Sequence, residues 1–295
     1  MPRRLSPKIK KIIDTAQQEK KRKQLKTPLR VSDAEALTAA EVVNLFPADS
    51  SERVYLEPFF QNGCVLFESM NQQIRFKRVA VNDEKNSVGC FFRALRDNKK
   101  EFLEKLAYTP YSLEEVRTAL THSTDVLEEA RRVWIRSRYT LSGKATTAGD
   151  WCRNPGESTE WRPTTLAKLE KDLKGFASHL KGVAVDSVDP IKFLDKWCKK
   201  ARHTNKHVVY PMFVFVSAPH MNDKQLTADQ HLKLLQHLLT TPATTKILLV
   251  GYSSDLYNIM LKTWNRIELK PTETKGKRKQ VVWHNYDDSF ANKKF

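Results

Sequence analysis

Short apolar runs alternate along the chain with stretches in which apolar residues recur at helical spacing. Runs rich in β-branched and aromatic residues predict strands at 53–60, 74–83, 182–189, 208–219, 246–252 and 278–286. Helical spacing predicts helices at 65–70, 87–106, 112–140, 166–180, 229–239 and 255–264. A stretch rich in Gly, Thr, Asn and Pro over 141–164 predicts an irregular loop.

Alternating strands and helices predict an α/β fold with a doubly wound sheet. In such a sheet, ligands bind beyond the carboxyl ends of the strands. Polar or turn-forming residues stand at four of these ends: 57–63, the pair Asn82 and Asp83, Asp189, and 217–220. These four places are therefore the candidate site.

The charge of the chain points to a kind of partner. Its 295 residues include 51 Lys and Arg against 34 Asp and Glu, which gives a net charge of +17. Residues 1–27 have few large apolar side chains and hold the densest basic run, Lys20, Lys21, Arg22 and Lys23. We expect this segment to be a flexible basic arm. A folded protein this positive attracts polyanions, so nucleic acid is the expected partner, against the alternative of a basic surface that only aids solubility.

Composition also excludes several classes of protein. No apolar run reaches the roughly 18–20 residues of a membrane span, and the basic N-terminus lacks the apolar stretch of a secretory signal. The four cysteines, Cys64, Cys90, Cys152 and Cys198, are far apart, and no zinc-binding spacing occurs. We therefore expect no membrane partner, no disulfide framework and no metal site. The scattered cysteines predict that the protein works in a reducing compartment. That compartment is cytoplasmic or nucleoid-like, or nuclear if the host is eukaryotic or the protein is viral.

Several segments together resemble the motifs of one family, in that family's order. They are YLEPFFQNGCVLFE, VNDEKNSVGCFFRALRDN, EARRVWIRSRYTLSGK, LKGVAVDSVDPIKFL, FVFVSAPHM, and KILLVGYSSDLYNIMLKTWNRIE with VVWHNY. The family is that of the Dam-type, adenine-specific DNA methyltransferases, and the resemblance spans roughly residues 28–288. It implies a Rossmann-like, S-adenosylmethionine-dependent methyltransferase fold with a mostly helical target-recognition insertion. The implied parts are an arm (1–27), a first core part (28–90), the insertion (91–178) and a second core part (179–295).

The catalytic motif of this family departs from its pattern here. In the family, an Asp-Pro-Pro-Tyr segment holds the flipped base: the Asp accepts a hydrogen bond from the target amine, and the Tyr stacks on the ring. The corresponding positions hold Ser217, Ala218, Pro219 and His220. Serine cannot supply the charge-assisted hydrogen bond of a carboxylate, so we expect the motif to be non-functional. Enzymes that methylate the cytosine amine use Ser-Pro-Pro-Tyr-like motifs, and this alternative stays open.

The cofactor positions that the resemblance implies are altered as well. Glycines in the first motif let the backbone approach the cofactor closely, but the first of them is Gln61 here, and the expected Gly-Gly-Lys turn is absent at 32–34. The remaining implied cofactor contacts are Glu57, Phe59, Gly63, Asp83 and Asp189. An alternative for Asp83 and Asp189 is that they only cap the strand ends. We expect no cofactor, or S-adenosylmethionine if the protein is active.

Basic and aromatic residues gather in the region that matches the target-recognition part. The expected nucleic-acid contacts are Arg131, Arg132, Arg136, Arg138, Lys144, Trp151, Arg153, Trp161 and Arg162, with Lys20–Lys23 of the arm. Cations neutralise phosphates and aromatic rings stack on bases. The alternative is that the arginines form a solvated helix face and that the tryptophans belong to the core.

These observations lead to one functional hypothesis with two alternatives. We expect a DNA-binding protein on a degenerate methyltransferase scaffold, acting by occupancy or as a non-catalytic subunit beside an active methyltransferase or another protein. RNA in place of DNA stays open. One alternative is an active amino-methyltransferase acting on adenine or cytosine. The other is a protein-interaction module whose inactive cleft holds a peptide.

Overall fold

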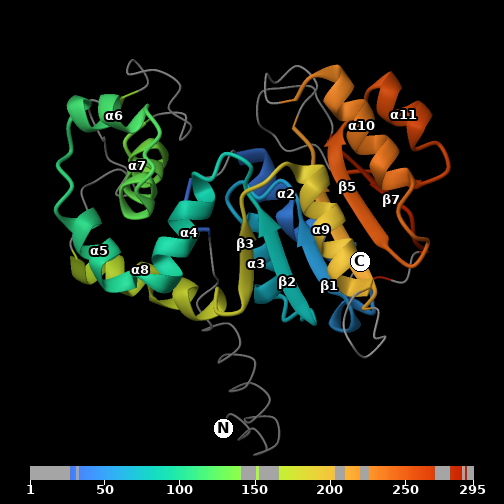
Figure 1. The fold of residues 1–295 in the computed structure, drawn as a ribbon, viewed down its shortest axis with the longest axis horizontal. Helices are drawn as coiled ribbons and strands as arrows, with labels where there is room; N and C mark the ends of the chain where they lie inside the picture. The colour runs from blue at the N-terminus through green and yellow to red at the C-terminus, as the bar shows by residue number, and fades with distance from the viewer. Residues whose placement is uncertain are drawn as a thin grey trace, which may run out of the picture.

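The computed structural model describes residues 27–30, 33–140, 151–152, 166–202, 210–219, 226–269, 280–287 and 290. The described strands form one seven-stranded sheet in the order β3-β2-β1-β4-β5-β7-β6 (Figure 1). The strands are β1 (Val54–Glu57), β2 (Arg78–Asn82), β3 (Val183–Asp186), β4 (Met212–Ser217), β5 (Lys246–Tyr252), β6 (Asn265–Glu268) and β7 (Gln280–His284). The predicted arm lies outside the described residues except for its last residue, Thr27.

Strand directions define the class of the fold. β1 through β5 pair in parallel, whereas β7 runs antiparallel to both β5 and β6. The strand order reverses between β1 and β4, which is the switch point at which doubly wound sheets bind ligands. The chain thus has the predicted Rossmann-like α/β fold, and its last strands form an antiparallel edge.

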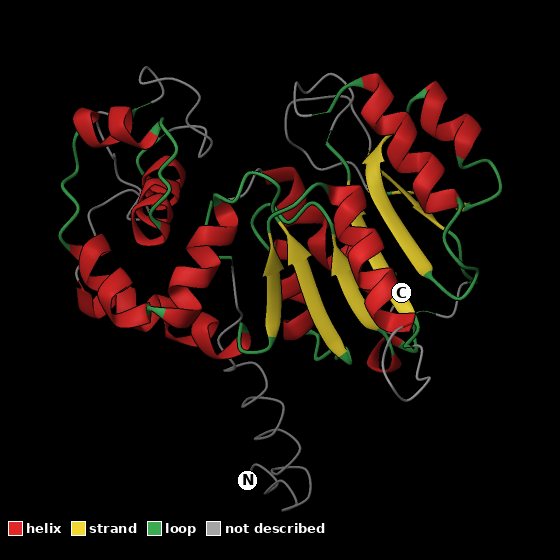
Figure 2. Cartoon of the chain, in the orientation of Figure 1, coloured by secondary structure: helices red, strands yellow, loops and turns green. Residues whose placement is uncertain are grey.

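Helices cover both faces of the sheet (Figure 2). They are α2 (Asp33–Asn44), α3 (Cys64–Asn71), α4 (Val88–Asp97), α5 (Lys99–Ala107), α6 (Leu113–Ala119), α7 (Val126–Arg138), α8 (Leu166–His179), α9 (Pro190–Arg202), α10 (Ala228–Leu239) and α11 (Asp255–Met260), with a short 3-10 helix at Ser50–Glu52. None of the described helices is long and apolar enough to cross a bilayer.

Two apolar clusters hold these layers together. Successive side chains of a strand point to opposite faces of the sheet. Tyr55 therefore packs with α2, α3 and α4 on one face, while Leu56 packs with α9, α10 and α11 on the other. The same alternation separates Phe213 from Val214 in β4. The central strands are buried on both sides, as their continuous apolar sequences predict.

The helices between β2 and β3 form a group beside the sheet (Figure 1). The single helix predicted over 87–106 is wrong: it is two helices, α4 and α5, which meet at Asn98, where φ is −126° and ψ is 37°. The helix predicted over 112–140 is likewise two, α6 and α7, separated at 120–125. The polar sequence Thr121–Asp125 ends one helix, and the side chain of Asp125 caps the next by accepting a hydrogen bond from the backbone of Glu128 over 2.7 Å.

Other boundaries differ at the ends of elements. β2 starts at Arg78 rather than at residue 74, and β6 was not predicted at all, because its four residues NRIE carry only one large apolar side chain. The predicted loop over 141–164 lies outside the described residues except for Trp151 and Cys152.

Candidate functional site

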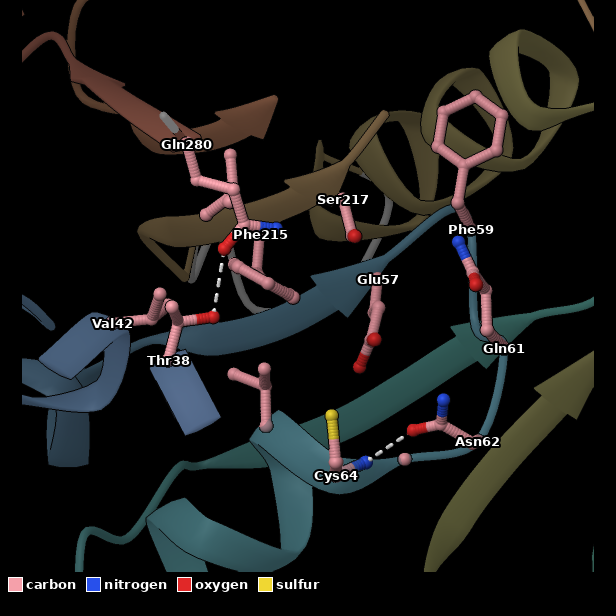
Figure 3. Close-up of a pocket in the computed structure, with 13 residues that line it drawn as sticks. Thr38, Val42, Glu57, Phe59, Gln61, Asn62, Cys64, Phe215, Ser217 and Gln280 are labelled. Atoms are coloured by element: carbon pink, nitrogen blue, oxygen red, sulfur yellow. Dashed lines mark hydrogen bonds between the residues drawn. The ribbon is translucent and has the colours of Figure 1, made fainter. Parts of the chain in front are cut away.

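A pocket lies where the carboxyl ends of β1 and β4 meet, at the switch point of the sheet (Figure 3). Its lining comes from both strands, from the loop after β1, and from α2, α3, β5 and β7. The lining residues are Thr38, Val42, Glu57, Phe59, Gln61, Asn62, Gly63, Cys64, Val65, Phe215, Ser217, Val250 and Gln280. The pocket therefore brings together Glu57, Phe59, Gly63 and Ser217 from the predicted site, although Ser217 lies far along the chain from the other three.

Glu57 places a carboxylate in this pocket (Figure 3). It is the last residue of β1 and only 4% exposed. Its Oε2 accepts a hydrogen bond from the hydroxyl of Tyr55 over 2.8 Å. Burial is the main cause, and the charge of Glu57 the second, of a pKa of Tyr55 well above its ordinary value. This hydroxyl therefore stays protonated and keeps donating.

The loop after β1 packs into the core of the protein. The backbone N–H of Phe60 donates to the carbonyl of Asn82 over 2.8 Å, and the Phe60 ring packs 5.1 Å from that of Phe92. Gly63 has φ of +74°, and a Cβ there would lie 2.8 Å from the ring of Phe67 and 2.9 Å from that of Phe60. The packing of the loop itself thus requires Gly63, whatever the loop binds.

The side chain of Asn62 occupies the start of α3. Its Oδ1 accepts a hydrogen bond from the backbone N–H of Cys64 over 2.9 Å, and its backbone carbonyl accepts one from the hydroxyl of Thr27. In glycine-rich loops, N–H groups at such a helix start are the ones that approach a ligand. In this loop, the N–H of Cys64 already donates its hydrogen bond to the side chain of Asn62.

The size of the pocket decides what it admits. Its cavity measures about 20 Å³, enough for about one water molecule, whereas sites for ligands of cofactor size occupy roughly 300–1,000 Å³. Gln61, which stands where the resemblance leads us to expect a glycine, and Phe59 are both in the lining. With its side chains so placed, this partly open pocket leaves little room beside Gln61 for a ligand of that size.

Asp83 lies at the end of β2 and caps a helix. Its Oδ2 accepts the backbone N–H of Gly89 over 2.9 Å. Burial raises the pKa of Asp83, and the backbone N–H groups of Gly89, Lys85, Ser87 and Val88 oppose that rise. The arrangement agrees with the capping alternative, and a cofactor role stays a prediction.

Asn82, beside it, is fully buried and joins two loops to the end of β2. Its Nδ2 donates to the carbonyls of Pro58 and Val188 over 3.2 and 2.9 Å, and its Oδ1 accepts the N–H of Val188 over 3.0 Å. Asn82 thereby fixes the loops that follow β1 and β3 relative to β2. Its place at a strand end was visible in the sequence, but its partners lie 24 and 106 residues away.

Asp189 caps α9, since its Oδ1 accepts the backbone N–H groups of Ile191 and Lys192, each over 3.0 Å. The carboxylate that ends β3 is instead Asp186, which sequence reasoning missed. Asp186 accepts the Nζ of Lys196 over 2.7 Å and the indole N–H of Trp197 over 2.9 Å. Both carboxylates are thus engaged by α9, and the cofactor role of Asp189 stays a prediction.

The altered catalytic motif begins at the last residue of β4. Ser217 is half-buried and lines the pocket. Ala218 is 8% exposed, and its N–H donates to the carbonyl of Val250 over 3.1 Å. Pro219 is half-buried, and His220 lies outside the described residues. The polar group that the described part of the motif presents to the pocket is therefore a serine hydroxyl.

Three of the arginines expected to contact nucleic acid form ion pairs within the helical region. Arg131 pairs with Glu115 and, over 2.8 Å, with Glu128, while Arg132 pairs with Glu128 over 3.0 Å. Arg136 pairs with Glu129 over 2.7 Å. Their side chains are only 12–18% exposed. To contact phosphate, they would have to exchange these partners, and the predicted contacts stay untested.

The remaining predicted contacts divide between the core and undescribed segments. Arg138 lies with its guanidinium 4.9 Å from the ring of Trp134, and Trp134 is 8% exposed and packs against Phe91. Trp151 is half-buried and packs near Tyr111, with the ring centroids 6.2 Å apart. Lys144, Arg153, Trp161, Arg162 and Lys20–Lys23 lie outside the described residues.

Comparison with solved structures found a distant neighbour. The rRNA methyltransferase aviRa from Streptomyces viridochromogenes shares 12% sequence identity with this chain at a TM-score of 0.36, over 89% of this chain and 87% of that one. No protein-family model matches the chain, and no curated protein sequence matches it.

Proposed function

We propose that this protein binds nucleic acid on a methyltransferase fold and does not transfer methyl groups. One observation carries the proposal: the pocket at the switch point contains Gln61 and Ser217 and has a volume of about 20 Å³. A methyltransferase must hold its methyl donor and its target amine at this place in the fold. With these side chains in place, the space that remains in the pocket is small for both of them.

The chemistry of the residues supports the same conclusion. Ser217 presents a neutral hydroxyl where the resembled family presents a carboxylate, and a neutral hydrogen bond is about half as strong as a charge-assisted one. Gln61 adds a side chain where the family has a glycine. Loss of the amine acceptor together with obstruction of the donor site affects both substrates of the reaction.

Charge supports the nucleic-acid part of the proposal. The net charge is +17, and a protein that neutralises several phosphates releases their counterions, which makes affinity fall steeply as salt rises. Binding to duplex or single-stranded DNA or to RNA is the expected activity. The functional result is occupancy, alone or beside a catalytic partner.

Two measurements on the full chain test this proposal. Isothermal titration with S-adenosylmethionine should give no binding heat at millimolar ligand, and ordinary micromolar affinity would contradict it. Fluorescence anisotropy with labelled oligonucleotides should give affinity that decreases by at least about tenfold between about 50 and 200 mM salt. Affinity indifferent to salt would favour the protein-interaction alternative.

An active amino-methyltransferase is the second candidate, and one observation favours it. Glu57 and Ser217 line the same pocket from adjacent parallel strands, so a carboxylate and a hydroxyl lie in one pocket. This candidate requires Gln61 and Phe59 to move aside, and it predicts that Ser217→Ala abolishes methyl transfer.

A further inference from the structure

A basic segment connects α3 to β2 at the amino ends of the strands, opposite the pocket. Within it, Ile74 and Phe76 point into the core, where the Phe76 ring lies 4.8 Å from that of Tyr55. Arg75 and Lys77, which alternate with these two residues along the segment, are exposed, and so is Arg78 at the start of β2. Three cations thus project to solvent from a short segment anchored in the core.

Backbone hydrogen bonds fix this segment at both ends. The N–H of Ile74 donates to the carbonyl of Ser69 over 2.9 Å, and that of Lys77 donates to the carbonyl of Arg53 over 2.8 Å. The cations therefore stand on a rigid backbone, so binding a ligand requires ordering only their side chains.

Tyr210 lies beside two of these cations. The Nζ of Lys77 is 5.3 Å from the centre of its half-buried ring, and the guanidinium carbon of Arg78 is 5.9 Å from it. The register of the sheet explains this meeting, because Val54 of β1 pairs with Arg78 on one side and with Met212 on the other. Residues that precede β4 are thereby brought next to the start of β2.

The arginines of α7 form ion pairs with carboxylates, whereas these three cations form none with the described residues. Among the described residues, no carboxylate lies within 4.0 Å of Arg75, Lys77 or Arg78. The nearby Glu68 is engaged by the side chains of Asn71 and Gln72.

We propose that Arg75, Lys77, Arg78 and Tyr210, here called the basic edge, form a contact site for single-stranded nucleic acid. The three cations bind successive phosphates, and the Tyr210 ring stacks on an unpaired base once Lys77 and Arg78 turn from the ring to the phosphates. This inference rests on the proposed function and gives it a location. The nucleic acid contacts the amino ends of the strands, opposite the pocket, and not the pocket itself.

Matched charge removals in the full chain test the location. One variant is Arg75→Gln/Lys77→Gln/Arg78→Gln, and its control is Lys85→Gln/Lys192→Gln/Lys233→Gln, which removes the same charge from exposed lysines elsewhere. The probe is a fluorescein-labelled oligothymidine of about 20 nucleotides, and circular dichroism checks that both variants fold. For the basic edge we expect at least about a tenfold loss of affinity and a salt slope smaller by about 2; the control should lose less than about threefold.

A third variant tests the stacking. Tyr210→Leu should weaken binding of the single strand about fivefold or more and leave binding of a duplex of the same length unchanged. Equal losses in the two triple variants, or equal effects of Tyr210→Leu on single strand and duplex, would overturn the basic edge while leaving nucleic-acid binding in place. Absence of any binding by the unaltered protein would instead overturn the proposed function.

Discussion

The hydroxyl of Ser87 donates a hydrogen bond to Oε1 of Glu129 over 2.7 Å and so joins the start of α4 to α7. Ser87 is the N-cap residue of α4, and Glu129 lies in α7, 42 residues later. Glu129 is fully buried, and it also accepts the backbone N–H of Ser123 over 2.8 Å and pairs with Arg136. One buried carboxylate therefore fixes how α7 sits on α4.

Removal of this carboxylate should destabilise the whole chain. We expect Glu129→Ala to lower the free energy of unfolding by about 3 kcal/mol, because Arg136 and Ser123 lose the partner that offsets their burial. The control is Glu114→Ala, which breaks an exposed pair with Arg117 and should cost less than about 0.5 kcal/mol. Urea denaturation measures both. Equal costs would show that Glu129 does not have the coupling role described here.

Acid should weaken the helical region through Glu128. The side-chain hydrogen bond from Arg131, with help from Arg132, lowers the pKa of Glu128 from 4.5 to about 2. The unfolded chain therefore takes up this proton first as the pH falls, so the contribution of Glu128 is complete above about pH 5 and is lost towards about pH 2.

Glu128→Gln should accordingly be less stable than the unaltered protein at about pH 7 by about 1–2 kcal/mol, and nearly equal to it at about pH 2.5. Urea midpoints at several pH values measure the difference. Glu104→Gln, at an exposed position on α5, is the control and should leave the pH profile unchanged. A constant difference between Glu128→Gln and the unaltered protein at every pH would contradict the ion-pair explanation.

A comparison of Gly182 with Gly63 distinguishes the cost of a left-handed backbone from the cost of a steric clash. Gly182 has φ of +82° and no atom within 4 Å of the position that a Cβ would take, whereas Gly63 has φ of +74° and two aromatic rings within 3 Å of that position. Gly182→Ala should therefore cost about 1 kcal/mol from the left-handed backbone alone. Gly63→Ala should cost at least about 1 kcal/mol more. Thermal melting of the two variants measures this, and equal costs would mean that the loop after β1 is looser than its packing indicates.

The buried strands were the most predictable part of the fold. Runs such as ILLV are apolar throughout because the middle of β5 is covered on both faces, and the alternation of strands with helices indicated the doubly wound order. The antiparallel direction of β7 could not be read in this way, since an apolar strand has the same pattern in either direction. β6 is a short edge strand with mostly exposed side chains, and so it lacks the pattern altogether.

The candidate site was predictable as a place but not in its contacts. The rule that ligands bind at strand ends located Glu57, Gly63 and Ser217, and they do line one pocket. The partners of Asn82, and the ion pairs that engage the arginines of α7, depend on residues brought together by tertiary packing. Sequence charge alone also could not separate Arg131, which is held in ion pairs, from the exposed Arg75.

Transfer of a labelled methyl group tests the central claim most directly. The full chain is incubated with tritium-labelled S-adenosylmethionine and, in separate reactions, with duplex DNA, single-stranded DNA and RNA, beside a Ser217→Ala variant as the matched control. We predict that label in the nucleic acid stays at the level of heat-denatured protein for both chains. Multiple-turnover labelling by the unaltered chain that Ser217→Ala abolishes would contradict the account.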